Sequence, residues 1–121
     1  MALSSRSTRQ QQLGSQAEQR ALQFLVEHGC EPIAVNERGK VGEIDLIVRD
    51  GVDWVFVEVR SRGSSTFGGA AASVTATKQA KLRKTAQLLL LRRFGQTPWP
   101  GCRFDVVAID AGELNWIKNA F

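Results

Sequence analysis

The sequence has few of the residues from which disulfide scaffolds and zinc sites are built. Its 121 residues include two cysteines, Cys30 and Cys102, and one histidine, His28. This excludes a disulfide framework and a tetrahedral zinc site of the usual kind. We expect both cysteines to stay reduced and to pack as small apolar side chains.

Long apolar segments are also missing. No stretch approaches the roughly 20 apolar residues of a membrane-spanning helix, and residues 1–12 lack the apolar core of a signal peptide. These absences predict a cytoplasmic protein that does not enter a membrane. Residues 1–13 are rich in Ser, Gln and Arg, so we expect a disordered tail followed by a single domain over residues 14–121.

Acidic residues are absent from a long part of the chain. The formal net charge is +4, and residues 59–104 contain no Asp or Glu. The basic residues of this stretch are Arg60, Arg62, Lys78, Lys81, Arg83, Lys84, Arg92, Arg93 and Arg103. A positive half of this kind attracts polyanions such as nucleic acid, although a solvated helix face would have the same composition.

The residue patterns predict the order α-β-β-β-α-β, followed by a last short strand. The first helix is expected to begin after Ser15 and to end at Gly29, because glycine suits a helix C-terminus. The second helix is expected to begin at Thr75 or Thr77 and to end at Gly95. Strands are expected around residues 32–36, 43–49, 54–60, 103–109 and 114–117.

This order predicts an α/β fold with an αβββαβ core, in which helices flank a mixed central sheet. A helix that joins two strands of one sheet makes a right-handed crossover, so residues 103–109 should run parallel to residues 54–60. Residues 61–73 form a Gly/Ser-rich loop, either mobile beside a site or a plain connector, without the ending of a phosphate loop. Residues 88–91 are all leucine and predict burial on more than one side of the helix.

The hairpin of residues 43–60 brings acidic residues together. With an even-numbered turn, its register places Asp45 opposite Glu58 and Glu43 opposite Arg60. Because side chains alternate between faces, these four residues are expected to share one face of the sheet. The other face is expected to be aliphatic, formed by Ile44, Leu46, Val48, Val55, Val57 and Val59. An odd-numbered turn would break this register.

If Asp45 and Glu58 lie opposite each other, the repulsion between their negative charges must be compensated. Opposed residues have β-carbons roughly 4.5–5.5 Å apart, where like charges are destabilising. A shared proton would compensate the pair, and so would a hard divalent cation such as Mg²⁺. The main alternative is a pair of charges that protects a sheet edge from aggregation. Glu43 opposite Arg60 has a simpler interpretation as a cross-strand salt bridge.

Five further charged residues have candidate roles. Arg60 is a poor base because it keeps its proton, but it can hold a phosphate and stabilise developing charge. Lys78 would supply an ammonium group if the second helix packs over this face, and is otherwise a solvated lysine. Glu18 reaches the cluster only if the first helix lies across the sheet; otherwise it is a capping-box partner. Glu43 and Asp105 are secondary candidates, and an arginine-paired carboxylate is the plainer interpretation of Asp105.

Several motifs in order resemble the signature of the YraN-like family. They are GEIDLI at 42–47, VFVEVR at 55–60, RFDVV at 103–107, IKNAF at 117–121, and the shorter Ala17-Glu18 and Asn36-x-Arg38. The resemblance covers residues 13–121. Members of this family are regarded as predicted endonucleases, distant relatives of archaeal Holliday-junction resolvases with the restriction-endonuclease-like PD-(D/E)xK fold.

This resemblance implies roles for individual residues. Asp45 and Glu58 would be the carboxylates that bind Mg²⁺ or Mn²⁺, and Glu18 would have the acidic role of the first helix in resolvases. Arg60 stands where the motif has lysine. That lysine is usually assigned to positioning or activating the attacking water, of which arginine can perform only the electrostatic part. Lys78 would then substitute for it from the second helix.

The leading hypothesis is metal-dependent hydrolysis of phosphodiester bonds in DNA, including branched DNA by analogy with resolvases. The residues expected to be catalytic are Asp45, Glu58, Arg60 and Lys78. Those expected to hold flanking phosphates, without reading bases, are Arg62, Lys81, Arg83 and Lys84. The same analogy suggests a homodimer joined by residues 88–91. The alternatives are a nucleic-acid-binding or adaptor module without turnover, which Arg60 favours, and a protein-interaction domain.

Overall fold

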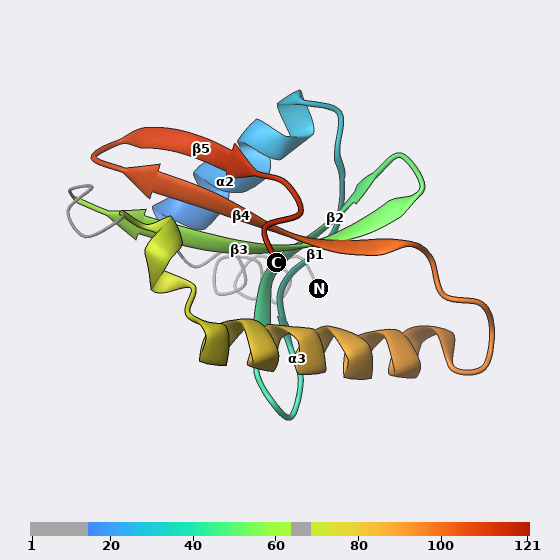
Figure 1. Ribbon diagram of the computed structural model, residues 1–121. Helices are drawn as coiled ribbons and strands as arrows, with labels where there is room; N and C mark the ends of the chain where they lie inside the picture. The colour runs from blue at the N-terminus through green and yellow to red at the C-terminus, as the bar shows by residue number, and fades with distance from the viewer. Residues whose placement is uncertain (1–14, 64–68) are drawn as a thin grey trace, which may run out of the picture.

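The computed structural model describes residues 15–63 and 69–121. Within these ranges, two α-helices cover a five-stranded sheet. Helix α2 (Gln16–Glu27) lies on one face of the sheet and helix α3 (Ala76–Phe94) on the other, which gives three layers (Figure 1). The tail predicted over residues 1–13 and the middle of the predicted loop, residues 64–68, lie outside the described residues.

The sheet is mixed, as predicted. Its strands are β1 (Glu31–Arg38), β2 (Glu43–Asp50), β3 (Asp53–Arg62), β4 (Cys102–Asp110) and β5 (Glu113–Ile117), in spatial order β1-β2-β3-β4-β5. Strands β3 and β4 are parallel, and each other neighbouring pair is antiparallel. The predicted parallel crossover through the second helix is therefore confirmed. A short 3₁₀ helix, η2 (Ala71–Ser73), precedes α3.

Both helices begin at the predicted caps. The hydroxyl of Ser15 accepts a hydrogen bond from the backbone amide of Glu18 at 3.1 Å. The hydroxyl of Thr75 accepts one from the amide of Lys78 at 3.3 Å, which selects Thr75 over the alternative cap. Helix α3 ends at Gly95, whose backbone has a positive φ of 57° that side chains disfavour. Local sequence therefore fixes where both helices begin and where α3 ends.

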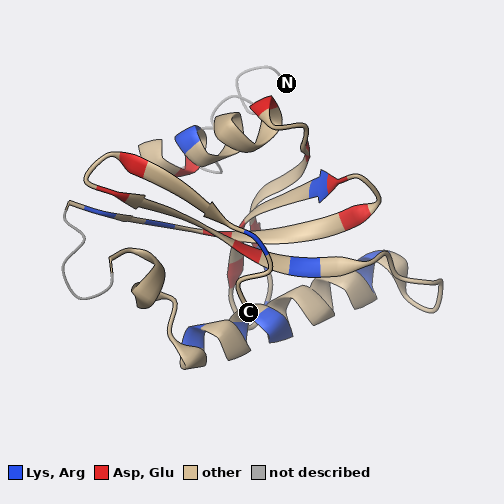
Figure 2. Cartoon of the chain, turned by 45° about the horizontal axis from the view of Figure 1, so that its top comes forward, with Lys and Arg blue, Asp and Glu red and all other residues tan. Residues whose placement is uncertain are grey.

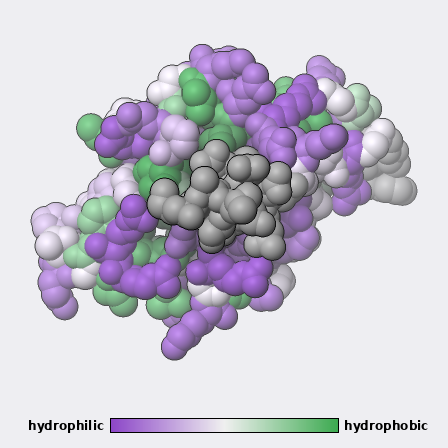
Figure 3. Space-filling view, turned by 180° about the vertical axis from the view of Figure 1, so that it is seen from behind, coloured by the Kyte–Doolittle hydropathy of each residue, from purple (hydrophilic) through white to green (hydrophobic). Residues whose placement is uncertain are grey.

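The core is divided by the sheet into two clusters. Beneath α3 lie Ile44, Ile47, Phe56, Leu82, Ala86, Leu89, Leu90 and their neighbours. Beneath α2 lie Ala21, Leu25, Leu46, Val48, Val55, Val57, Val59, Val107 and Ile109. Seen from behind, hydrophilic side chains cover most of the coloured surface, and hydrophobic ones show in small groups (Figure 3). Neither helix in the described part of the chain is long and apolar enough to cross a membrane.

Two predictions about burial need correction. Leu89 and Leu90 are buried in the core beneath α3, but Leu91 is 50% exposed because it lies on the outer side of the helix. Only part of the leucine run therefore remains for contact with another molecule. Cys30 is buried as expected, whereas Cys102 is exposed at the start of β4.

The register of the central hairpin agrees with the prediction near the turn and departs from it farther away. Ile47 pairs with Phe56, but the last backbone pair of β2 with β3 is Leu46 with Val57. The predicted Glu43–Arg60 salt bridge is wrong, because the two strands no longer pair at these positions. Glu43 instead contacts the guanidinium of Arg38 at 3.7 Å.

The predicted position of Ile44 is also wrong. Strict alternation predicts that it shares the aliphatic face with Leu46, which packs beneath α2. Ile44 instead belongs to the cluster beneath α3. Residues two apart on a regular strand share a face, so the alternation of β2 is interrupted at Asp45, between these two residues.

Candidate active site

The candidate site lies where β2 and β3 separate. Asp45 is the first residue of β2 beyond the last backbone pair, that of Leu46 with Val57. There the Oδ2 atom of Asp45 accepts a hydrogen bond from the backbone amide of Val59 at 2.9 Å. The carboxylate thus replaces the strand partner that this amide would otherwise lack. Asp45 is therefore held in the gap between the two strands.

Glu58 meets Asp45 in this gap. Its side chain comes from β3, is 8% exposed, and shares a hydrogen bond with the Asp45 carboxyl group. Burial, and next the negative charge of Asp45, raise the pKa of Glu58 to about 8, although the Arg60 guanidinium acts in the opposite direction. Burial also raises the pKa of Asp45. The structure therefore brings the two carboxyl groups together, and without a metal they retain a proton at neutral pH.

Arg60 supplies the nearest positive charge. Its Nη2 atom lies 2.5 Å from Oε2 of Glu58, two residues earlier on the same strand. Its Nε atom is buried and has no hydrogen-bond partner among residues 15–63 and 69–121. The guanidinium is thus partly engaged with Glu58 and retains a donor for another acceptor.

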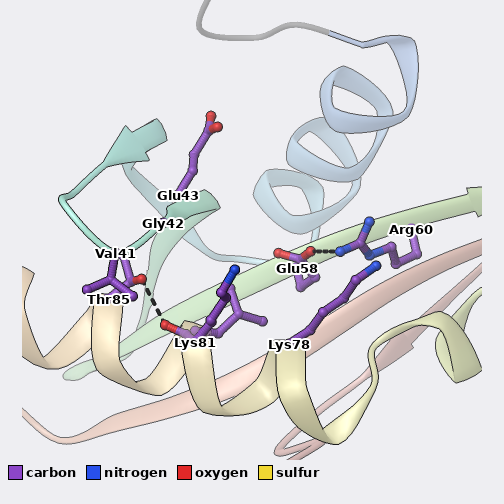
Figure 4. A pocket seen from close by; sticks show the side chains of 9 residues that line it. Val41, Gly42, Glu43, Glu58, Arg60, Lys78, Lys81 and Thr85 are labelled. Atoms are coloured by element: carbon purple, nitrogen blue, oxygen red, sulfur yellow. Dashed lines mark hydrogen bonds and ion pairs between the residues drawn. The ribbon is translucent and has the colours of Figure 1, made fainter.

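A cavity of about 180 Å³ adjoins Glu58 and Arg60. It is lined by Val41, Gly42, Glu43, Glu58, Arg60, Lys78, Lys81, Leu82 and Thr85. The ammonium groups of Lys78 and Lys81 reach up from α3 toward the Glu58–Arg60 pair, while the Glu43 carboxylate points away (Figure 4). Helix α3 therefore packs over this face, as the proposed role of Lys78 required. The cavity is smaller than ordinary ligand pockets of about 300–1,000 Å³, and suits a single phosphate better than a base.

Glu18 approaches the pair from α2. Burial, and then the negative charge of Asp45, raise its pKa, and Glu43 adds to this effect. Hydrogen bonds from the Ser15 backbone and the Asn36 side chain lower it. The Oε1 atom is buried and has no hydrogen-bond partner in the described ranges. Glu18 is therefore both a capping-box partner and a neighbour of Asp45, so the two interpretations of this residue are compatible.

The acidic side chains of the site suit a hard divalent ion that has few ligands from the protein and takes the rest from water. Across residues 15–63 and 69–121, no three Asp, Glu, His or Cys side chains converge closely enough to form a metal site by themselves. Mg²⁺ in proteins usually has one or two carboxylate ligands and keeps several waters. Asp45 and Glu58 meet this requirement, and the free Oε1 atom of Glu18 suits a contact through water.

Asp105 is not part of the site. It is fully buried and accepts hydrogen bonds from Arg103 at 3.0 Å and from the Trp116 indole at 2.9 Å. The backbone amide of Asn119 donates to it at 2.9 Å. Trp116 packs with the cluster beneath α2, so this network occupies the face opposite the basic cavity. The plainer interpretation of Asp105, an arginine-paired carboxylate, is confirmed.

The four predicted phosphate-binding residues are dispersed. Lys81 lines the cavity, and Lys84 is exposed on α3. Arg83 lies over the ring of Phe121, 5.4 Å from its centroid, on another side of the helix. Arg62 is exposed at the end of β3. Lys and Arg are the charged residues along α3 (Figure 2), so the helix presents a positive surface that extends beyond the cavity.

Sequence reasoning missed the contact that bounds the cavity. A β-carbon on Gly42 would lie 3.1 Å from the hydroxyl oxygen of Thr85, so glycine permits the β1–β2 connection to approach α3 closely. Thr85 is 1% exposed and donates to the Lys81 carbonyl at 2.8 Å. The two glycines at positions 39 and 42, between two predicted strands, were the available signal.

Comparison with known proteins identifies the family. Residues 17–109 match the family described as "Uncharacterised protein family UPF0102". A UPF0102 protein of Enterobacter sp. (strain 638) is 52% identical over 110 residues, which cover 91% of this chain and 84% of the relative. The UPF0102 protein YraN of Shigella flexneri is 51% identical over the same coverage. YraN of Salmonella newport is 49% identical over 117 residues, or 97% of this chain and 89% of the relative. The chain therefore belongs to the UPF0102 family, as its resemblance to YraN-like sequences predicted.

Proposed function

We propose that this protein is a metal-dependent nuclease of the restriction-endonuclease-like fold that hydrolyses phosphodiester bonds in DNA. The observation that carries the proposal is the pair of buried carboxyl groups of Asp45 and Glu58, which meet on adjacent strands beside a basic cavity. A buried pair of this kind destabilises the fold, and carboxyl groups with perturbed pKa values cluster at functional sites. The order of helices and strands is that expected of the proposed fold.

Asp45 and Glu58 would hold Mg²⁺ or Mn²⁺, with Glu18 in contact through water. When bound, such an ion supplies a water of lowered pKa and a positive charge opposite the phosphate. Asp45 is preorganised for this role because the Val59 amide fixes one of its oxygens at 2.9 Å. The Glu58 carboxyl must release its proton to bind the ion, since metal ligands are deprotonated.

The basic residues would bind the phosphate. Arg60 of β3 and Lys78 of α3 both line the cavity, and the Lys78 ammonium reaches toward the Arg60 guanidinium, so their donors can contact different oxygens of one phosphate group (Figure 4). Positive charge placed there stabilises the additional negative charge that develops during hydrolysis. Arg60 keeps its proton and therefore acts as an electrostatic group and not as a base. Contacts of this type address the backbone, so we expect cleavage that is independent of base sequence.

The proposal is tested by incubating single-stranded, duplex and branched DNA with the purified protein and Mn²⁺. We expect Asp45→Asn and Glu58→Gln to cut ~100-fold more slowly or worse, the loss that removal of a preorganised electrostatic group causes. Glu113→Gln, which changes an exposed carboxylate on β5, is the matched control and should cut normally. Wild-type protein that binds DNA but never cuts it, or variants that cut equally well, would exclude the nuclease.

The second candidate is a nucleic-acid-binding module that keeps this fold without turnover. The short contact between Arg60 and Glu58 favours it, because the guanidinium compensates the buried charge without a metal. In that case DNA binding should weaken with added salt, and neither Mn²⁺ nor Asp45→Asn should change it. A nuclease would instead bind DNA more tightly with a metal that does not support cleavage, such as Ca²⁺.

A further inference from the structure

Asn36 has an unusual backbone conformation for its position. Among the described residues, three that are not glycine have a positive φ: Asn36 at 47°, Ala111 at 50° and Asn119 at 53°. Ala111 and Asn119 lie in turns, whereas Asn36 lies inside strand β1. Left-handed residues are disfavoured there, and an observed outlier of this kind justifies the search for a function.

The side-chain alternation of β1 changes at this residue. Val35, directly before Asn36, packs with the cluster beneath α2. In a regular strand, Glu37, directly after Asn36, would lie on the same face as Val35. Glu37 instead points to the α3 side, where its carboxylate lies 3.3 Å from the guanidinium of Arg92. Residues two apart share a face in a regular strand, so the left-handed residue between them shifts the pleat.

Strand β2 changes its alternation at the facing position. Val35 pairs with Leu46, and Glu37 pairs with Ile44. Leu46 packs beneath α2 and Ile44 beneath α3. The residue of β2 between these two pairs is Asp45. The alternation of side chains between the two faces of the sheet is thus interrupted at facing positions of β1 and β2.

This change determines where Asp45 points. In a regular strand, Asp45 would lie on the α3 side of the sheet with Ile47 and Glu58, so its carboxylate would point out of the sheet and away from the backbone amide of Val59. Because the alternation is interrupted at Asp45, its carboxylate lies in the gap between β2 and β3, where it accepts a hydrogen bond from the Val59 amide and still meets Glu58. The hydrogen bond that fixes the Asp45 carboxylate therefore depends on the left-handed residue opposite it.

We propose that Asn36 is a positioning residue of the site: its left-handed backbone shifts the pleat of β1 and β2 and thereby aims the Asp45 carboxylate at β3. The Asn36 side chain also lies near Glu18, the third acidic group near the pair, and lowers the pKa of that carboxyl group. Asparagine suits both tasks, since it tolerates a positive φ and carries an amide. The inference deepens the proposed function, but its structural part does not depend on cleavage.

Three variants separate the backbone of Asn36 from its side chain. Asn36→Gly keeps access to a positive φ but loses the amide, and Asn36→Ala loses both. Asn119→Ala is the matched control, because it removes a second left-handed asparagine, in the turn after β5. We expect Asn36→Ala and Asn119→Ala to lower the melting temperature similarly, so that overall destabilisation is the same in both.

The first readout needs no metal. Hydrogen exchange of the Val59 amide, measured by NMR relative to amides of β4, reports whether Asp45 still accepts from it. We expect Asn36→Ala to accelerate this exchange by about tenfold or more, and Asn36→Gly and Asn119→Ala to leave it within about twofold of wild type. Unchanged exchange in Asn36→Ala, or equal acceleration in Asn36→Gly, would overturn the proposal.

The second readout is the affinity for Mn²⁺, measured by calorimetry without DNA. Residues that orient metal ligands typically contribute 10–100-fold to affinity, so Asn36→Ala should bind Mn²⁺ about 10–100-fold more weakly, while Asn119→Ala binds normally. Normal affinity in Asn36→Ala would overturn the proposal. If wild type itself binds no Mn²⁺, the proposed function fails, and the exchange of the Val59 amide alone decides the role of Asn36.

Discussion

At the scale of a single residue, Glu58 links stability to pH. Its pKa is about 8 in the folded protein against an ordinary value of 4.5. Between these values the folded state binds more protons than the unfolded state, so the free energy of unfolding falls as pH rises through this window. Below about pH 4.5 Glu58 imposes no penalty, and above about pH 8 it imposes the full penalty. The metal-free protein should therefore lose stability toward alkaline pH.

Glu58→Gln tests this link, because glutamine has a similar shape and does not ionise. Between about pH 5 and about pH 9, in the presence of a chelator, we expect the melting temperature of wild type to fall by ~5 °C more than that of the variant. Thermal unfolding followed by circular dichroism measures the difference. Parallel curves for the two proteins would show that the Glu58 carboxyl is not protonated in the folded state.

The same carboxyl groups make metal binding depend on pH. A metal and a proton compete for the oxygens of Asp45 and Glu58, so affinity for Mn²⁺ should rise with pH. An ion at about 100 times its dissociation constant stabilises the folded state by roughly 2.7 kcal/mol. We expect Mn²⁺ to raise the melting temperature more at about pH 8 than at about pH 6. An increase that is equal at both values, or equal in Asp45→Asn, would place the ion elsewhere.

At the scale of elements, much of the architecture follows from local sequence. Cap residues such as Ser15 and Thr75 identify where the helices begin, and the even turn of the hairpin gives the register near its end. The same register led to the expectation that Asp45 and Glu58 meet, which they do. Errors arose where strict alternation was assumed. The displacement of Ile44 depends on a positive φ at Asn36, and a residue's identity does not report its φ.

Helix α3 carries the prediction at this scale. Lys81 lines the cavity, so Lys81→Gln should remove one phosphate contact from bound DNA. For single strands we expect the slope of log affinity against log salt to decrease by about 0.7. Lys118→Gln is the matched control, because Lys118 lies over the ring of Trp116 at 4.3 Å, on the side of the sheet covered by α2. Fluorescence anisotropy at several salt concentrations measures both slopes. Equal decreases in both variants would mean that the cavity is not where the phosphates bind.

At the scale of the whole molecule, the sheet separates two buried polar systems with different tasks. Glu58 lies on the α3 side, next to a cavity that solvent can reach. Asp105 lies on the α2 side, fully buried, and joins Arg103 to the chain that follows β5. Sequence alone presented both as acidic residues within strands. Their difference emerges only from what each faces, which depends on the packing of separate elements.

Asp105 should therefore affect stability and not chemistry. Asp105→Asn keeps the shape but leaves Arg103 with Asp50 as its only carboxylate partner in the described residues, and it directs an amide N–H group at one of the donors that Asp105 accepts from. We therefore expect a loss of about 3 kcal/mol or more. Chemical denaturation measures this loss, and the exposed Glu113→Gln should change stability by less than about 0.5 kcal/mol. Because the Asp105 network lies across the sheet from Glu58, the fraction of Asp105→Asn that remains folded should bind Mn²⁺ with wild-type affinity. A stable variant with impaired Mn²⁺ binding would instead join Asp105 to the site, and the separation of the two systems by the sheet would have to be abandoned.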